Sequence, residues 1–176
     1  MKDILAKLKG GDRRSIRRSG EAAKDVSKAP ALFADLFAGL LDEDRLVRTR
    51  AADAIEKVTR DRPDLLQPWK RQLLGTVSPL EDKELRWHVA QMLPRLKVTP
   101  NEQQVVLRIL MGYLEDGSSI VKTFSMQALA ELAMRDGRLL ALVTPLIEQL
   151  TRTRTPAMKR RGRKLLKQLK PLRGSE

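Results

Sequence analysis

The sequence predicts an all-α protein: a right-handed α-solenoid of about four helix pairs with an N-terminal helical cap. Three observations predict it. A nine-residue phrase recurs at nearly constant spacing, apolar stretches of helical periodicity lie between its copies, and no stretch alternates polar and apolar residues over the length of a strand. The 176 residues can bury a core, and contents of 41% hydrophobic and 32% charged residues are typical of a folded domain.

The recurring phrase defines one helix of each pair. Each copy begins with an aliphatic residue and a base, carries mostly small or apolar residues at its fifth and sixth places, and has an aliphatic residue at its ninth. The copies read VRTRAADAI, LRWHVAQML, VKTFSMQAL and MKRRGRKLL, and they start at Val47, Leu85, Val121 and Met158. The starts are 38, 36 and 37 residues apart, so a unit of about 37 residues repeats along the chain.

The other helix of each pair precedes its phrase. These helices are expected within 30–41, 65–77, 105–114 and 139–150, where apolar residues fall at helical spacings. Three residues before each phrase stands a residue type that favours a helix N-cap: Asp44, Asp82, Ser118 and Thr155. One pair cannot bury its apolar stripe alone, and stacked pairs bury it continuously. The predicted repeats are 29–60, 63–97, 100–136 and 137–172, followed by a tail at 173–176.

Residues 1–28 match the repeat less well and are expected to form the cap. The pattern indicates a short helix at 2–8, a break at Gly10 and Gly11, and a helix from Asp12 that is interrupted near Ser19 and Gly20.

The phrase resembles the HEAT repeat, in which an aliphatic residue and a base precede a run of small residues. The closest copy has Val47 and Arg48 followed by AADAI at 51–55. The resemblance covers about 29–172 and is to small HEAT-repeat proteins of the bacterial type. It implies a solenoid whose second helices line a concave face. The fourth copy departs most, since Gly162 and Arg163 replace the small pair, as suits a terminal repeat that meets water.

The repeat register sorts the side chains of the second helices. With the aliphatic start as position 0 and 100° per residue, positions 0, 4, 7, 8 and 11 form the core stripe, position 3 flanks it, and positions 2, 6 and 9 lie opposite. If the resemblance holds, positions 2, 6 and 9 face the groove. The binding candidates on or beside that face are Arg50, Asp53, Trp87, His88, Gln91, Phe124 and Gln127.

Trp87 is the most informative of these candidates. Other repeats carry Thr or Arg at the same position, so the fold does not require a large apolar side chain there. An exposed aromatic side chain beside bases and amides is typical of a recognition patch. The alternative is that Trp87 fills a gap against the first repeat, and that His88 is a hydrogen-bonded structural residue. Trp69, in a first helix, is interpreted as packing.

Positive charge lies at the two ends of the sequence. The net charge of the whole chain is +13, of which 1–28 carries +5, 151–176 carries +9 and the segment between them −1. The anion-binding candidates are Arg160, Arg161, Lys164, Lys167, Arg13 and Arg14. They are expected either to bind phosphate, an acidic partner or an anionic surface, or to solubilise a cap. The bases at position 1 (Arg48, Arg86, Lys122 and Lys159) are interpreted as partners of carboxylates in the turns.

Most catalytic chemistries find no support in the sequence. There is no Cys and one His, which excludes thiolate and multi-His metal sites, and no phosphate-binding loop stands out. No cofactor is expected, no apolar run is long enough to span a membrane, and the first residues do not read as a secretory signal, so a cytoplasmic location is expected.

The leading hypothesis is a non-catalytic scaffold that binds a protein segment in the groove. The alternatives are nucleic-acid binding through the basic ends and, less favoured, base excision of the kind performed by HEAT-like alkylated-base glycosylases, with Asp53 as the essential acid.

Overall fold

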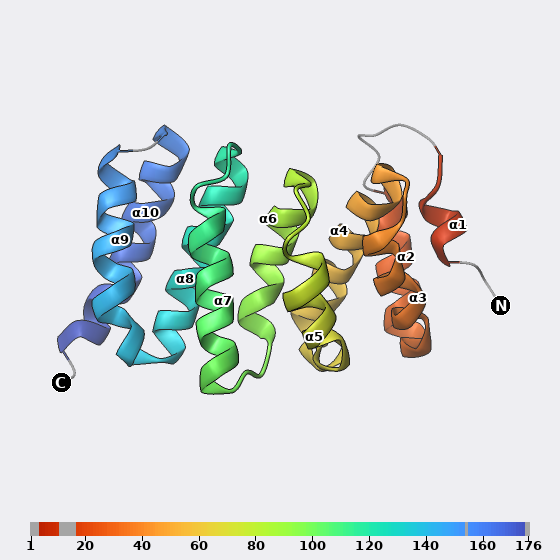
Figure 1. Cartoon of the computed structure of the whole chain (residues 1–176), viewed down its shortest axis with the longest axis horizontal. Coiled ribbons are helices and arrows are strands. Elements are labelled where there is room, and N and C mark those ends of the chain that lie inside the picture. The colour runs from red at the N-terminus through yellow and green to blue at the C-terminus, as the bar shows by residue number, and fades with distance from the viewer. Residues whose placement is uncertain (1–3, 11–16, 154, 175–176) are drawn as a thin grey trace. The chain divides into compact units, whose positions relative to one another are not determined.

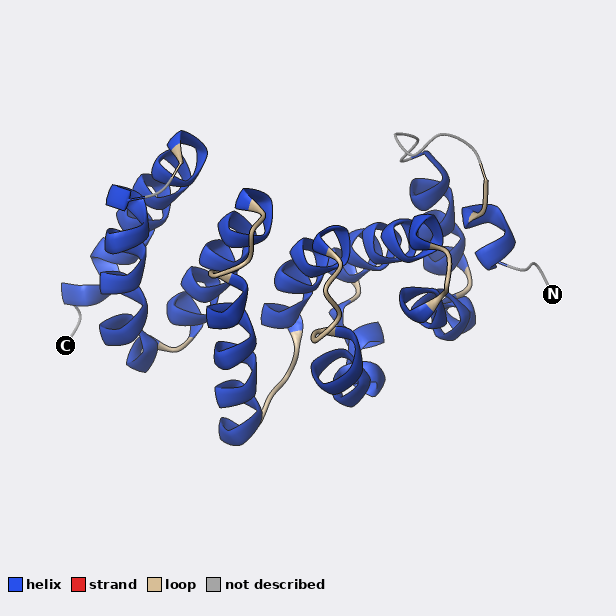
Figure 2. Ribbon diagram, turned by 45° about the horizontal axis from the view of Figure 1, so that its top comes forward, coloured by secondary structure: helices blue, strands red, loops and turns tan. Residues whose placement is uncertain are grey.

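The computed structural model describes residues 4–10, 17–153 and 155–174, and within these ranges the regular structure is helical, with no strand (Figure 2). This agrees with the all-α prediction. The chain divides into two compact units, residues 1–97 and 98–176, which are described separately.

In the first unit the helices are α1 (Ile4–Leu8), α2 (Arg17–Lys28), α3 (Phe33–Ala38), α4 (Arg45–Asp61), α5 (Lys70–Gln72) and α6 (Lys83–Met92). Short 3-10 segments at Pro30–Leu32, Gly39–Leu41, Pro63–Trp69 and Leu93–Arg95 and a π turn at Leu73–Val77 join them. In the second unit the helices are α7 (Pro100–Tyr113), α8 (Ser119–Arg135), α9 (Leu140–Thr153) and α10 (Pro156–Leu169), with 3-10 segments at Gly137–Leu139 and Lys170–Gly174.

Two expectations about single elements are wrong. The helix expected over 65–77 is a 3-10 segment, one turn of α-helix and a π turn, because Pro68 lacks the N–H that a continuous helix needs. The expected interruption near Ser19 and Gly20 is absent from α2. One glycine costs a helix only about 1 kcal/mol, and α2 offsets that cost by burying Val26 completely. The part of the predicted cap at 11–16 lies outside the described residues.

The long helices begin where the sequence places their caps. Asp44 accepts a hydrogen bond from the backbone N–H of Leu46 at 2.8 Å, and Asp82 accepts one from Glu84 at 3.0 Å. Thr155 and Ser118 are the N-cap residues of α10 and α8, but the Ser118 hydroxyl makes no capping bond. These caps stabilise the first turn and fix where each core stripe starts.

The first unit is organised around α4, which packs against α2 on one side and α6 on the other (Figure 1). α3 also packs against α4. Phe37 of α3 is buried and stacks on Trp69 with 4.7 Å between ring centroids. The interpretation of Trp69 as packing is thus confirmed. Gly39 permits a close approach, because a Cβ there would lie 2.7 Å from a methyl of Leu5 and 3.0 Å from the Cβ of Ala51.

The second unit is organised in the same way around α8 and α10. α8 packs against α7, α9 and α10, and α10 also packs along α9 (Figure 1). Gly162 lies at the contact between α9 and α10, where a Cβ would fall 1.9 Å from the hydroxyl oxygen of Thr151. This close approach explains why the fourth phrase has glycine where the others have a larger residue.

The predicted core stripe is buried in each phrase. All four starting residues, Val47, Leu85, Val121 and Met158, have no exposed surface. The residues at position 11 are at most 7% exposed: Val58, Leu96, Leu132 and Leu169. The helical period read from the sequence therefore places the core in the right place along each second helix.

Candidate functional site

The exposed face of the second helices is narrower than the helical wheel predicts. Position 9 was expected to face outward, but Glu56, Pro94 and Ala130, which occupy it in the first three phrases, are buried. The reason is that the two second helices of each unit pack against each other, and that α4 and α8 also pack against the first helices α3 and α7. Of the three positions expected to face outward, positions 2 and 6 keep part of their surface in every phrase, so the candidate binding face is a strip of those residues in each unit.

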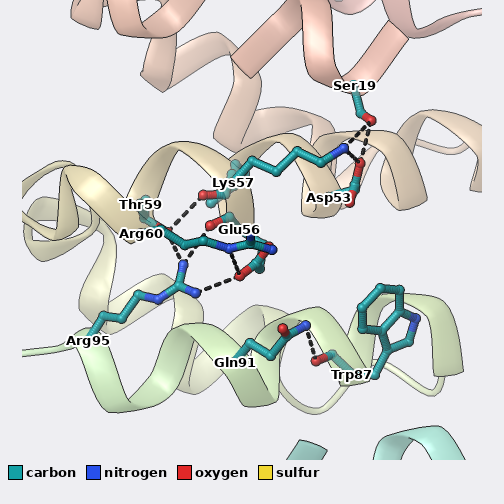
Figure 3. Close-up of polar contacts among 10 residues, drawn as sticks. Ser19, Asp53, Glu56, Lys57, Thr59, Arg60, Trp87, Gln91 and Arg95 are labelled. Atoms are coloured by element: carbon teal, nitrogen blue, oxygen red, sulfur yellow. Dashed lines mark hydrogen bonds and ion pairs between the residues drawn. The ribbon is translucent and has the colours of Figure 1, made fainter. Parts of the chain in front are cut away.

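Trp87 is the largest side chain on that strip in the first unit. It lies in α6, is half-buried, and packs against His88 with 3.5 Å between ring centroids. Its indole Nε1 donates a hydrogen bond to the Glu84 carboxylate at 3.2 Å. The side-chain amide of Gln91, one turn further on, donates to the Trp87 carbonyl at 3.2 Å (Figure 3). The contacts with His88 and Glu84 hold the ring in one orientation and leave part of it exposed.

A shallow hollow of about 300 Å³ lies between the first turns of α4 and α6. It is lined by Arg45, Leu46, Thr49, Lys83 and Glu84. Glu84 therefore links this hollow to Trp87, since the same side chain lines the hollow and accepts the indole hydrogen bond. The lining carries both signs of charge and one apolar side chain, a composition found at the polar rim of protein interfaces.

Asp53, at position 6 of α4, is engaged within the chain. Its carboxylate forms an ion pair with Lys57 and accepts a hydrogen bond from the Ser19 hydroxyl of α2 (Figure 3). Lys57 also donates to the same hydroxyl at 3.2 Å. The cluster therefore attaches α2 to α4, and one oxygen of the carboxylate, Oδ2, is bound by both neighbours.

The structure places Arg50 and His88, both expected beside the groove, inside the first unit. Arg50 is 3% exposed and donates hydrogen bonds of 2.7 Å to the carbonyls of Leu8 and Gly10, so it attaches the end of α1 to α4. His88 is 1% exposed, and its Nδ1 has no hydrogen-bond partner among the described residues. Neither side chain is available to a partner, because the segments packed beside α4 and α6 cover the flank that the helical wheel left open.

Burial also sets the charge of His88. Removal from water lowers the pKa of the imidazole from 6.5 to about 4. The nearby carboxylates of Asp53, Glu56 and Glu84 act to raise this pKa, and the charge of Lys57 acts to lower it, but burial is the largest influence. His88 is therefore neutral at physiological pH. The structural alternative for His88 was a hydrogen-bonded residue; the imidazole is buried, but its Nδ1 has no hydrogen-bond partner among the described residues.

A buried ion cluster joins α4 to the segment that follows α6, and sequence reasoning missed it. Glu56 is 2% exposed and binds Arg60 at 2.6 Å and Arg95 at 2.6 Å. Arg95 also donates to the Glu56 carbonyl at 2.6 Å and to the Thr59 hydroxyl at 2.7 Å (Figure 3). Burial raises the pKa of the Glu56 carboxyl, but the hydrogen bonds and charges of the two arginines outweigh burial and hold the pKa below its ordinary value.

The bases at position 1 were interpreted as structural, and Arg48 behaves in that way. It donates to the carbonyls of Asp42 and Glu43 and pairs with Asp82, the cap of α6, at 3.3 Å. Arg86 donates to the carbonyl of Leu80 at 2.9 Å. These arginines hold the turns between the helices rather than projecting as a charged track.

In the second unit the candidate residues form one cluster. Phe124 of α8 is half-buried, and the guanidinium of Arg161 from α10 lies 6.0 Å from its ring centroid. Arg161 also donates a hydrogen bond to the side-chain oxygen of Gln127, whose amide donates to Glu131 at 2.9 Å. The structure thus brings three of the predicted residues together. Arg161 serves this internal contact, whereas Arg160, Lys164 and Lys167 are exposed on α10.

Two of the anion-binding candidates, Arg13 and Arg14, lie outside the described residues. Among the residues that the structure does describe, no group of three or more His, Asp or Glu side chains could hold a metal ion. In that part of the chain no helix is long and apolar enough to cross a membrane.

A comparison with family models, with curated proteins and with solved structures finds no match to this chain.

Proposed function

We propose that the chain is a non-catalytic interaction module, an α-solenoid of HEAT-like repeats that binds a segment of a protein partner. The binding surface in the first unit is the strip of positions 2 and 6 on α4 and α6, with Trp87 as its anchor. The partner segment lies against the indole ring and extends over the hollow beside Glu84.

The repeat pattern supports the architecture. Four phrases recur with nearly constant spacing, and the equivalent residues at positions 0 and 11 are buried in all of them. In each unit second helices pack against each other, α4 against α6 and α8 against α10. This is the packing expected when each pair buries its apolar stripe against the next.

The observation that carries the proposed function is the setting of Trp87. A half-exposed tryptophan stands at a position that Thr or Arg fills in the other phrases, and its ring is held by Glu84 and His88. A rigid, partly exposed tryptophan provides a large contact area at small entropic cost. For that reason tryptophan is enriched among the residues that dominate protein–protein binding.

A second observation weighs against catalysis by the groove residues. Arg50 and His88 are buried, and Asp53 is bound by Lys57 and Ser19. Base excision with Asp53 as the acid would require this cluster to open. The polar groups of the candidate face are held in internal contacts, which suits a surface that recognises shape more than one that transfers protons.

The proposal is tested by placing a photo-crosslinking amino acid at position 49, which lines the hollow together with Glu84, and by identifying the proteins captured in native lysate. The captured protein is then purified and its affinity measured by calorimetry for the wild type, for Trp87→Ala and for Thr123→Ala. Thr123 occupies the same repeat position in α8 and is the matched control.

We expect Trp87→Ala to weaken binding about 30-fold, corresponding to about 2 kcal/mol for an anchor residue, and Thr123→Ala to leave it unchanged. Circular dichroism and the thermal midpoint verify that both variants are folded. Equal affinities for the wild type and folded Trp87→Ala would refute Trp87 as the anchor. A Trp69→Phe variant, in which Trp87 is the remaining tryptophan, provides an independent fluorescence signal that must change when the partner binds.

A further inference from the structure

The outward face of α10 is a stripe of bases, which we call the basic stripe: Arg160, Arg163, Lys164 and Lys167. On the helical wheel these four residues fall within an arc of about 100° opposite the core stripe, and all four side chains are exposed. The sequence from 149 to 175 contains ten Lys or Arg residues and no Asp or Glu.

Within the described residues, the side chains of the basic stripe have no internal partner, and on this helix four such bases lie together on one face. Elsewhere in the described residues many bases are paired: Arg48 and Arg45 with Asp82, Arg60 and Arg95 with Glu56, and Arg138 with Asp136. None of the four stripe residues forms an ion pair or side-chain hydrogen bond with any described residue. Four unpaired positive charges within two helical turns repel one another, and a polyanion would relieve that repulsion.

The apolar face of α10 cannot serve a membrane. Met158, Leu165 and Leu169 are at most 3% exposed and pack against α8 and α9. An amphipathic helix that lies in a membrane surface must bury such a face among the lipids, and in α10 the core of the second unit already occupies it. Only charge attraction to headgroups would remain.

The composition of the basic stripe also argues against a protein partner and against single-stranded nucleic acid. Protein interfaces depend on aromatic or aliphatic anchors, and single strands bind by stacking of bases on aromatic side chains. The stripe contains neither kind of residue. A surface made of cations alone matches a ligand that presents regularly spaced anions and no required base contact, which is the backbone of a duplex.

We propose that the basic stripe of α10 binds the phosphate backbone of double-stranded nucleic acid without regard to sequence. Arg160 and Lys167 are seven residues apart, or about 10 Å along the helix axis. At 3.4 Å of rise per nucleotide on each strand, this spans about three phosphate steps. The planar guanidinium groups of Arg160 and Arg163 suit bidentate contact with phosphate oxygens. This inference is independent of the partner proposed for Trp87, which lies in the other unit.

The test is a titration of the full chain against a fluorescent 24-base-pair DNA duplex, followed by anisotropy at salt concentrations from 50 to 200 mM. The same sequence as duplex RNA, the single strand alone, and vesicles of phosphatidylcholine with 20% phosphatidylserine are the comparison ligands. One variant replaces all four stripe residues by Gln. The matched control replaces four exposed bases outside α10 by Gln and loses the same charge: Lys28, Arg71, Lys97 and Arg108.

Four phosphate contacts give a slope of log K against log salt of about −3.6, so the stripe alone makes affinity fall about 100-fold over this fourfold range. We expect the stripe variant to lose binding at 100 mM salt, with a slope shallower by about 3 to 4, and the control to keep most of both. Equal binding of duplex DNA and duplex RNA supports contact with the phosphates that both share. A preference for one of them identifies which duplex the stripe binds.

Several results would overturn the proposal: no duplex binding by the wild type at 50 mM salt, an equal loss in the stripe and control variants, tighter binding of the single strand, or binding to vesicles without binding to duplex. Far-UV circular dichroism and the thermal midpoint verify that each variant is folded. All eight replaced side chains are exposed, so their replacement is not expected to unfold the protein, and a loss of binding then reports lost contacts.

Discussion

The buried imidazole of His88 should make the stability of the first unit depend on pH in a range where carboxylates contribute little. The informative perturbation is His88→Leu, which removes the titrating group and keeps a side chain of similar volume. Because Nδ1 has no hydrogen-bond partner among the described residues, the variant loses no bond at that atom. We expect the two proteins to differ by at most about 1 kcal/mol at pH 7.

The sign follows from the direction of the pKa shift. The pKa of His88 is about 4 in the folded chain against 6.5 for an exposed imidazole. Between these two values the unfolded chain binds a proton that the folded chain does not, so stability rises with pH across this window and is lost as pH falls. From pH 7 to pH 5 the linkage relation gives a loss of about 2 kcal/mol from this one group.

The assay is urea unfolding followed by circular dichroism at pH 7.0, 6.0 and 5.0, with the wild type and His88→Leu measured in parallel. The variant is the reference for all other titrating groups. His88 is the only histidine in the sequence, so its imidazole resonances in an NMR titration of the folded protein are unambiguous.

We expect the wild type to lose about 2 kcal/mol more than the variant between pH 7 and pH 5, and the imidazole of the folded chain to remain neutral at pH 5. Parallel stability curves, or an imidazole that titrates near pH 6.5 in the folded protein, would refute both the burial argument and the packing of α6 against α4.

Two other predictions concern the stability of each unit. Glu56→Gln leaves two arginines facing a neutral amide and should cost about 2 kcal/mol of unfolding free energy in urea titrations, discounted for the exposure of one arginine. The control is Asp64→Asn, which breaks the exposed ion pair of Asp64 with Arg62 and should have little effect. Equal effects of the two substitutions would contradict the role of the cluster. Gly162→Ala should destabilise the second unit by about 2 kcal/mol, because its Cβ would collide with Thr151. The control is Gly112→Ala, which has open space around the added methyl group and should raise the thermal midpoint. If Gly162→Ala also raised the thermal midpoint, the close approach of Gly162 to Thr151 would be refuted.

The sequence predicts well those features that depend on local spacing. Val47 and its equivalents are buried because an aliphatic stripe of helical period must face a core. Asp44 and Asp82 cap their helices because a short acceptor side chain at that offset satisfies the free N–H groups of the first turn. Both inferences need only residues within one helix and its preceding turn.

The features that the sequence did not predict depend on what lies beside a helix. Arg50 is buried because the end of α1, about 40 residues earlier, covers it, and Glu56 is buried because Arg95, 39 residues later, reaches it. A helical wheel assigns a direction to each side chain but contains no information about the neighbour in that direction. The candidate binding face is therefore smaller than the helical wheel predicted. It consists of positions 2 and 6, which in α6 are Trp87 and Gln91.

The contacts at the two ends of α6 bear on how fast a partner could bind. Asp82, which caps the start of α6, is paired with Arg48, and Arg95, just after its end, is paired with Glu56. A helix attached to its neighbour at both ends presents its surface residues already in place. Association at Trp87 would then need no prior rearrangement, and its rate constant should fall in the ordinary range of about 10⁵–10⁷ M⁻¹s⁻¹ for docking of preformed surfaces. Partners that bind with different affinity would then differ mainly in their dissociation rate constants.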